Sequence, residues 1–368
     1  MKPGAPAGAP AKVYVEPTTA CNLACATCVR HAWDEPEGWM TWETFEAVVD
    51  GLEGGTVAFM GLGEPLLHPR FPDMVRLAKD RGLRTEVTTN ALLLDEHLAA
   101  DLLEAGLDQL VVSIDGASAE AFGRVRSGAS LERVVENVRH LHDGGGPNYG
   151  PSVRIGVEFV AMRSNVAELP GLGRLAARLG ASFVIVTNVL AYTPDLVGET
   201  LYDHGAGSLA GADTSAAPRW LLPVFDWDEP LGAAVGGALA RSGPVSFSGA
   251  DAGPAGRCPF VEAEACAVAW HGGVSPCPAL LHTYTCYVRG REKRVLRWEA
   301  GRLPDESLPA IWAGAGYAAF RERVRRFDFP PCTDCGCELA ADNREDCFGN
   351  GHPTCGDCLW ARGVIRCP

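Results

Sequence analysis

The stretch VYVEPTTACNLACATCVR, from Val13 to Arg30, is the part of the sequence around which the rest of the chain is organised. It opens with a short apolar run that predicts a strand at 13–15 and continues into a loop with a CX3CX2C pattern. The cysteines of this loop are Cys21, Cys25 and Cys28. Three thiolates on one short loop can bind a small iron-sulfur cluster and leave one iron open for another ligand. A zinc site is the alternative, because zinc prefers four ligands and His31 could supply the fourth.

Length and composition define the broad class of protein. The chain has 368 residues, 47% of them hydrophobic, enough for one large domain and a smaller one. No apolar run is long enough to span a bilayer, and the opening MKPGAPAGAPAK lacks the apolar core of a signal peptide. The net charge of −14 disfavours nucleic acid and anionic membranes as partners. These features predict a cytoplasmic protein.

The fourteen cysteines are unevenly distributed. Three lie in the first loop, none lies between Cys28 and Cys258, and eleven follow from Cys258 to Cys367. A disulfide scaffold is the alternative, but such scaffolds are typical of short secreted chains. Clusters of cysteines in a long chain without an export signal predict metal or iron-sulfur sites in a reducing compartment.

Short apolar strands alternate with helices along the first half of the chain. The strands are expected at 13–15, 56–60, 84–89, 109–114, 153–160 and 182–187. This alternation predicts parallel βαβ units. Six strands rather than eight predict an α/β fold with a partial (β/α)6 TIM-like barrel, with its site at the carboxyl ends of the strands. We expect a disordered arm at 1–12, the barrel at 13–215, a bridge at 216–252 and a small cysteine-rich cluster-binding domain at 253–368.

The CX3CX2C loop resembles the signature of the radical S-adenosylmethionine (SAM) enzymes. In that family the three thiolates hold three irons of a [4Fe-4S] cluster, and the amino and carboxylate groups of SAM bind the fourth. The resemblance implies reductive cleavage of SAM to methionine and a 5′-deoxyadenosyl radical, which removes a hydrogen atom from the substrate. It also implies a reducing partner such as flavodoxin or ferredoxin. One departure is Thr27, where many members of the family have an aromatic residue against the adenine.

The same resemblance implies residues that bind SAM. The loop GLGEP at 61–65 stands where the family has its glycine-rich GGEP motif, and glycines let backbone carbonyls approach a ligand closely. Arg126 could pair with the SAM carboxylate, although it could also be an exposed cation at a helix end, and Arg124 could replace it. The cofactor-binding residues expected are Gly61, Gly63, Glu64, Ser113, Asp115, Arg126 and Thr187; Thr89, Asn90 and Asn188 are further polar candidates at strand ends.

The C-terminal region resembles the SPASM domain, which binds two auxiliary [4Fe-4S] clusters, so the resemblance implies three clusters in all. Its cysteine pattern departs from the family pattern after Cys335, so more than one assignment is open. The preferred assignment gives one cluster Cys258, Cys266, Cys277 and Cys358, and the other Cys332, Cys335, Cys355 and Cys367. It leaves Cys286, Cys337 and Cys347 spare. Cys337 or Cys347 could replace Cys355, and zinc is the alternative metal.

Several functions are compatible with these motifs. The preferred one is an oxidoreductase of natural-product biosynthesis that dehydrogenates a small-molecule substrate, such as a sugar or aminocyclitol, with the auxiliary clusters as electron acceptors. The alternatives are an epimerase of such a substrate and a peptide- or protein-modifying maturase. The tail DCFGNGHPTCGDCLWARGVIRCP also resembles radical SAM maturases of metallopterin (tungsten) oxidoreductases. A non-catalytic iron-sulfur or zinc protein is the alternative from another class.

The distribution of cysteines favours oxidation, whereas the lack of an acid at one position counts against it. An epimerase must return a hydrogen atom, commonly from a thiol, and the span 29–257 contains no cysteine. Only twenty residues precede Cys21, so no leader-binding module is expected there, which disfavours a peptide substrate. Some SPASM oxidases have an acidic base directly after the second cysteine of the domain, but this chain has Pro278. The candidates for the catalytic base are therefore Glu158, Asp226 and Asp228.

Overall fold

The computed structural model describes residues 8–33, 35–144, 153–203, 219–241, 246–248 and 256–367. Most of the arm expected at 1–12, and parts of the bridge expected at 216–252, lie outside these residues. A single large sheet runs through the described part, with a separate two-stranded hairpin beside it. None of the helices described is long and apolar enough to cross a membrane.

Parallel strands follow one another across the sheet in the order of the sequence. They are β1 (Lys12–Val15), β2 (Thr56–Phe59), β3 (Arg84–Thr89), β4 (Gln109–Ser113), β5 (Arg154–Ala161), β6 (Phe183–Asn188), β7 (Arg219–Leu221) and β8 (Ser246–Ser248). The first six are the strands that the sequence predicts, and the α/β class is confirmed. β7 and β8 extend the sheet beyond the expected six strands, within the segment expected to be a bridge.

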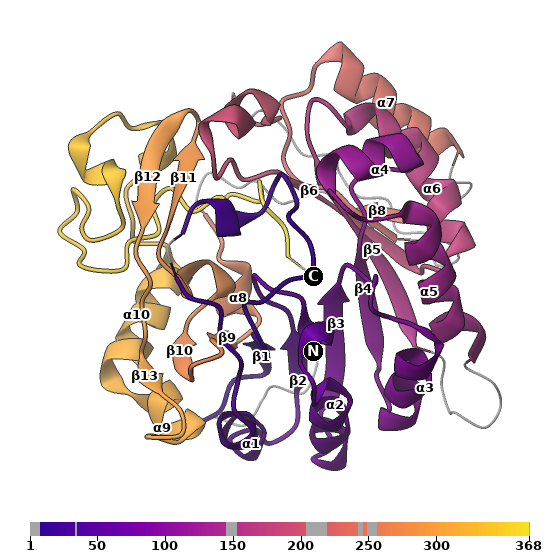
Figure 1. The fold of residues 1–368 in the computed structure, drawn as a ribbon. Coiled ribbons are helices and arrows are strands. Elements are labelled where there is room, and N and C mark those ends of the chain that lie inside the picture. Colours follow the sequence, from indigo (N-terminus) through magenta and orange to yellow (C-terminus); the bar gives the residue numbers. More distant parts are fainter. Residues whose placement is uncertain are drawn as a thin grey trace.

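The cysteine-rich region continues the same sheet from the opposite edge. β9 (Ala265–Val268) pairs in parallel with β1, with Ala265 beside Lys12. The antiparallel strands β10 (Gly273–Ser275) and β13 (Gly301–Arg302) follow. β1 therefore pairs with β2 and β9 rather than with β8, so the parallel strands form an open barrel. The hairpin of β11 (Tyr284–Val288) and β12 (Arg291–Val295) stands beside it (Figure 1).

Helices connect the strands and cover one side of the sheet (Figure 1). In the first part of the chain they are α1 (Trp42–Asp50), α2 (Phe71–Asp80), α3 (Glu96–Ala105), α4 (Ala119–Val125), α5 (Leu131–Gly144), α6 (Leu169–Arg178) and α7 (Glu229–Arg241). In the cysteine-rich part they are α8 (Pro259–Glu262), α9 (Leu308–Ala313) and α10 (Ala315–Arg326). Thr41 caps the N-terminus of α1, because its hydroxyl accepts a hydrogen bond from the Thr44 N–H.

The alternation of side chains along β5 shows how the sheet presents functional groups to the barrel interior. Ile155, Val157 and Phe159 are buried in the main hydrophobic core. Because successive side chains on a strand point to opposite faces, Glu158 points away from that core, into the space enclosed by the strands. A carboxyl group at this position is a candidate for function, because burying its charge without a fixed partner destabilises the fold.

Candidate functional site

The cysteine loop lies at the carboxyl ends of the first strands. The Glu64 N–H, after β2, donates to the Ala20 carbonyl at 2.8 Å. The Asn90 side-chain amide, after β3, donates to the Asn22 side chain at 2.9 Å. These bonds join the segment around Cys21 to two neighbouring strand ends, which is where a parallel barrel places its site.

The glycine loop touches the cysteine loop through its backbone. A Cβ atom on Gly63 would lie 2.3 Å from the Thr18 carbonyl oxygen, and one on Gly61 would lie 2.7 Å from the Glu16 Cγ. Only glycine permits so close an approach. The backbone of 61–64 is thereby held against the start of the cysteine loop, and its contact with SAM stays a prediction.

Glu64 has a structural partner for each oxygen of its carboxylate. Oε1 accepts hydrogen bonds from the Thr89 hydroxyl at 2.6 Å and from the Leu66 N–H at 3.1 Å, and Oε2 accepts one from the Asn90 N–H at 2.9 Å. Burial raises the pKa of Glu64, and these donors oppose that rise. The expected contact of Glu64 with SAM is therefore one of its backbone, because the side chain ties the glycine loop to the end of β3.

A buried cation faces the cysteine loop from the start of the segment after α4. Arg126 Nη2 lies 2.8 Å from Asp115 Oδ2, and Nη1 lies 4.0 Å from the Cys25 sulfur. Among the described residues Arg126 Nε has no hydrogen-bond partner. A buried guanidinium with an unused N–H beside a thiol suits an anionic group such as a carboxylate or an anionic cluster. Arg126 is therefore not the exposed helix-end cation that was its alternative.

Asp115 and Ser113 extend this polar group along β4. Asp115 is fully buried, and its Oδ1 accepts a hydrogen bond from the Val160 N–H at 3.0 Å. Ser113 is paired in register with Glu158 on β5. Asp115 thus orients Arg126, and its role as a direct contact of SAM stays a prediction.

Glu158 is a carboxyl group that can change its protonation state near neutral pH. Its pKa is raised to about 7, chiefly by burial and next by the charge of Asp115, while Arg126 opposes the rise. Burial raises the pKa of Cys367, and the negative charge of Glu158 raises it further. A carboxyl group with this pKa can accept a proton during catalysis.

The other two candidate bases lie elsewhere. Asp228 caps α7, because its Oδ1 accepts a hydrogen bond from the Leu231 N–H at 2.9 Å, and it is exposed. Asp226 follows β7 and is half-buried, with its backbone N–H bonded to the Leu201 carbonyl at 2.7 Å. Of the three, only Glu158 interacts with Asp115 and Arg126 in the described geometry, so the structure favours it.

The thiols of the cysteine loop are held in their protonated form unless a cation binds. Burial raises the pKa of Cys21, Cys25 and Cys28, that of Cys25 to about 11, although Arg126 opposes the rise at Cys25. Metal binding requires thiolates, so a bound metal would have to displace these protons. His31, the fourth ligand of the zinc alternative, instead places Nε2 3.0 Å from the Cys25 carbonyl oxygen.

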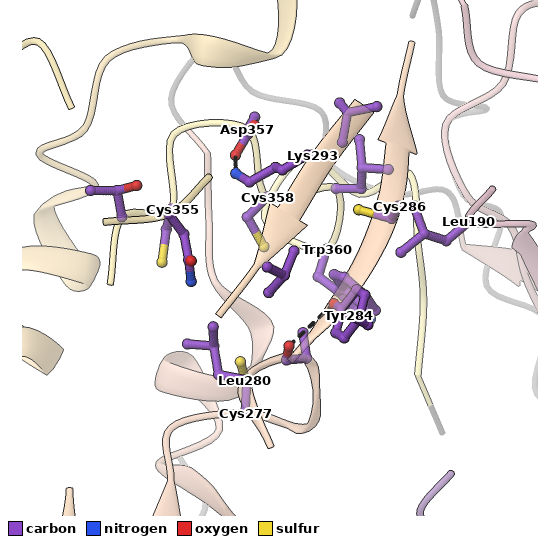
Figure 2. Close-up of a pocket in the computed structure, with 16 residues that line it drawn as sticks. Leu190, Cys277, Leu280, Tyr284, Cys286, Lys293, Cys355, Asp357, Cys358 and Trp360 are labelled. Atoms are coloured by element: carbon purple, nitrogen blue, oxygen red, sulfur yellow. Dashed lines mark hydrogen bonds and ion pairs between the residues drawn. The ribbon is translucent and has the colours of Figure 1, made fainter. Parts of the chain in front are cut away.

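The auxiliary region contains a first group of cysteines around one pocket. Figure 2 shows the sulfurs of Cys277, Cys355 and Cys358 on its wall. Burial raises the pKa of Cys277, and the charges of Cys258, Cys358 and Cys355 raise it further. These four thiols are thus close enough to interact, which is the number that a fully ligated [4Fe-4S] cluster requires.

A second group lies in the segment that follows α10. Burial raises the pKa of Cys332 to about 11, and among its other causes are Cys347, Cys337 and Cys335. The preferred assignment left Cys337 and Cys347 spare, but the structure places both with Cys332 and Cys335. Their closeness in sequence to that pair was the available signal. Among the described residues no three His, Cys, Asp or Glu side chains are close enough to share one metal ion; a [4Fe-4S] cluster spans more space, because each cysteine binds a different iron.

Two residues expected to be cluster ligands and one expected to bind SAM have surroundings that differ from those expectations. Cys266 is fully buried on β9 in the main hydrophobic core; burial raises the pKa of its thiol, and the charge that acts on it is that of Arg321. Cys367 lies beside Trp360, whose indole N–H donates to its sulfur at 3.0 Å, rather than with Cys332. The Thr187 hydroxyl accepts a hydrogen bond from the Arg366 N–H at 2.8 Å, so it anchors the C-terminal tail.

Comparisons with known proteins agree with these features. The radical SAM superfamily model matches residues 15–161, and the SPASM model, an iron-sulfur cluster-binding domain, matches residues 258–336. A tungsten-containing aldehyde ferredoxin oxidoreductase cofactor-modifying protein of Pyrococcus furiosus is 32% identical over 97% of this chain and 96% of its own length. The mycofactocin maturase MftC of Mycobacterium tuberculosis is 26% identical over 89% of this chain and 76% of its own length.

Solved structures with the same fold are more distant in sequence. Streptococcus suis SuiB bound to its precursor peptide SuiA has a TM-score of 0.57 at 14% identity, covering 85% of this chain and 67% of SuiB. Native anSMEcpe with bound AdoMet (SAM) has a TM-score of 0.57 at 17% identity, covering 88% of this chain and 86% of that one. Together with the cysteine loop, the glycine loop and the two auxiliary cysteine groups, these matches establish that the chain is an enzyme of the radical SAM superfamily that carries a SPASM domain and is related to maturases.

Proposed function

We propose that this enzyme is a maturase that modifies the cofactor of a tungsten-type oxidoreductase. The observation that carries this proposal is the similarity to the Pyrococcus furiosus cofactor-modifying protein, which extends over both the barrel and the auxiliary region. The dehydrogenation of a sugar or aminocyclitol, preferred from the sequence, receives no support from the relatives. The maturase alternative fits them better.

The residues of the site have distinct tasks in this proposal. When bound, the cluster of the cysteine loop supplies the electron that cleaves SAM. The backbone of 61–64 receives the ammonium group of SAM, and Arg126, held by Asp115, faces its carboxylate. Glu158, with a pKa of about 7, takes up a proton from the reacting substrate. The cysteines are free of disulfides, which suits a reducing compartment such as the cytoplasm and an electron donor such as flavodoxin or ferredoxin.

Modification of a peptide is the second candidate. It is supported by the fold that this chain shares with SuiB, whose structure is bound to its precursor peptide SuiA. The two candidates differ in the molecule that is modified. A cofactor maturase changes the mass of a small cofactor, whereas a peptide-modifying enzyme changes the mass of a polypeptide.

The test compares substrates under one set of conditions. The cluster-reconstituted protein is incubated with SAM and dithionite, together with an isolated pyranopterin cofactor, a cofactor-free tungsten-type oxidoreductase, a short peptide or an aminocyclitol. We expect 5′-deoxyadenosine to form and a mass change only on the cofactor or the oxidoreductase. Cys25→Ala serves as the inactive control. A mass change on the peptide alone would favour the second candidate, and one on the aminocyclitol alone would overturn the proposal.

A further inference from the structure

His282, in the auxiliary region just before β11, lies between two carboxylates from the first part of the chain. Its side chain is fully buried. Nε2 is 2.8 Å from Glu16 Oε2, and Nδ1 is 2.5 Å from Glu35 Oε2. Since a carboxylate oxygen can only accept, a ring that bonds to both must carry a proton on each nitrogen. The geometry therefore describes an imidazolium.

The surroundings of His282 stabilise this charge. Burial alone would lower the pKa of His282, but hydrogen bonds to Glu16 and Glu35 raise it to about 9. The other titratable or charged groups that act nearby are Arg297, which faces Glu35, and His271 on the auxiliary side, whose neutral form is favoured by burial. His282 is therefore charged at neutral pH and loses its proton only as the pH rises through about 9.

Glu16 connects this cation to the glycine loop. Its Oε1 accepts a hydrogen bond from the Leu62 N–H at 3.2 Å, and its side chain fills the space next to Gly61. The Trp270 N–H, from the auxiliary region, lies 3.4 Å from Glu16 Oε2. The position of the loop that receives the ammonium group of SAM thus depends on a carboxylate that His282 neutralises.

Glu35 connects the same cation to the segment that leaves the cysteine loop. Its Oε1 accepts a hydrogen bond from the Thr283 N–H at 3.1 Å. Trp33, two residues before it, packs against the His282 ring edge-to-face at a centroid distance of 4.7 Å. One side chain of the auxiliary region therefore holds both segments that flank the SAM site.

We propose that His282 is a positioning residue through which the auxiliary region sets the affinity of the barrel for SAM. The proposal rests on the SAM chemistry of the proposed function but not on its substrate. Without the imidazolium, the buried Glu16 carboxylate keeps an unpaired charge and must move or take up a proton. Movement of Glu16 releases the Leu62 N–H, and protonation weakens the hydrogen bond that this N–H donates to Oε1; both loosen the hold on the glycine loop.

The test is the dissociation constant of SAM for the oxidised, cluster-reconstituted full chain between pH 7 and pH 10, with no reductant. We expect the wild-type affinity to be constant up to about pH 8 and to fall as His282 loses its proton. His282→Gln should bind SAM about 10-fold more weakly at pH 7.5 and show no such fall. Glu35→Gln should start the fall at a lower pH, because removing one carboxylate lowers the pKa of His282.

His142→Gln is the matched control, since His142 also pairs with a carboxylate, Asp143, at 2.9 Å but on the surface. It should match the wild type throughout. Wild-type affinity and pH profile in a folded His282→Gln would overturn the proposal. If that variant fails to fold, Glu35→Gln decides: an unshifted pH profile would overturn the proposal even if the affinity were lower. A wild-type chain that binds no SAM would instead contradict the proposed function.

Discussion

The two cysteine-rich regions of this enzyme are built in opposite ways. The first loop carries its three cysteines close together in sequence and is held by hydrogen bonds from neighbouring strand ends. In the auxiliary region, the cysteines of the first group come from positions spread between 258 and 358. There the buried Lys293, on β12, pairs with Asp357 next to Cys358 (Figure 2). The half-buried Arg291, on the same strand, lies 2.9 Å from Asp357.

This difference determines which parts of the fold each group of cysteines needs before it can bind its metal. A loop whose ligands are close together in sequence can bring its thiols together by itself. It needs the hydrogen bonds from the strand ends only to be oriented toward the barrel interior. A group assembled from distant segments needs the whole auxiliary fold before its thiols meet, because the chain must first lose the conformational entropy of long connections. We therefore expect the cysteine loop and the auxiliary region to bind their clusters independently of each other.

The largest effect is expected from the triple variant Cys21→Ala, Cys25→Ala and Cys28→Ala. It should reduce formation of 5′-deoxyadenosine under dithionite to background while about eight of about twelve iron atoms per chain remain. Iron analysis and chromatography of the nucleoside measure both. If the triple variant lost nearly all its iron, the two regions would not assemble independently.

Gly63→Ala should nearly abolish SAM binding, because the new Cβ would lie 2.3 Å from a backbone carbonyl that cannot move easily. We also expect a loss of about 1–3 kcal/mol in the free energy of unfolding from overpacking. Gly123→Ala is the control: it lies inside α4, where an added Cβ would have no neighbour within 4 Å, and it should be neutral or stabilising by about 0.5–1 kcal/mol. Equal affinity of the two variants for SAM would show that the contact of Gly63 is unimportant.

In the auxiliary region, Cys347→Ala should lose about four of the twelve iron atoms, because Cys347 lies with Cys332. Cys266→Ala should keep all of them and lose only about 1 kcal/mol of stability as a core substitution. Iron and sulfide analysis of the reconstituted proteins distinguishes the outcomes. Loss of iron from Cys266→Ala but not from Cys347→Ala would instead favour the assignment preferred from the sequence.

The smallest effect on iron content and SAM affinity is expected from Glu158→Gln, which is tested through the stability of the fold. In the folded protein Glu158 has a pKa of about 7, above that of the unfolded chain, so its ionisation destabilises the fold as the pH rises from about 4.5 to 7. The variant should therefore be more stable than the wild type by about 3 kcal/mol at pH 8 and nearly equal to it at pH 4.5. Thermal unfolding at the two pH values provides the measurement, and a difference that is independent of pH would contradict the assigned pKa.

Local patterns predicted most of the barrel and the first cysteine loop. The strands β1–β6 are short apolar segments between helical ones, so their period is visible in the sequence. β7 and β8 were missed because each has three residues, too few to show a period. The pairing of β9 with β1 and the partners of Glu16 and His282 depend on contacts between distant segments, for which a single sequence gives no local signal. The same holds for Thr187, whose partner is the backbone of Arg366.

The parallel pairing of β1 with β9 also bears on synthesis of the chain. Residue 12 reaches its partner, residue 265, only after the barrel strands have left the ribosome. At about 5–20 residues per second this delay is on the order of ten to fifty seconds. During that time the edge of β1 that β9 will cover exposes unpaired backbone groups, which can pair with another nascent chain. We therefore expect the yield of soluble protein to depend on translation speed, and fragments that end before residue 265 to aggregate even though their own eight-strand unit is complete.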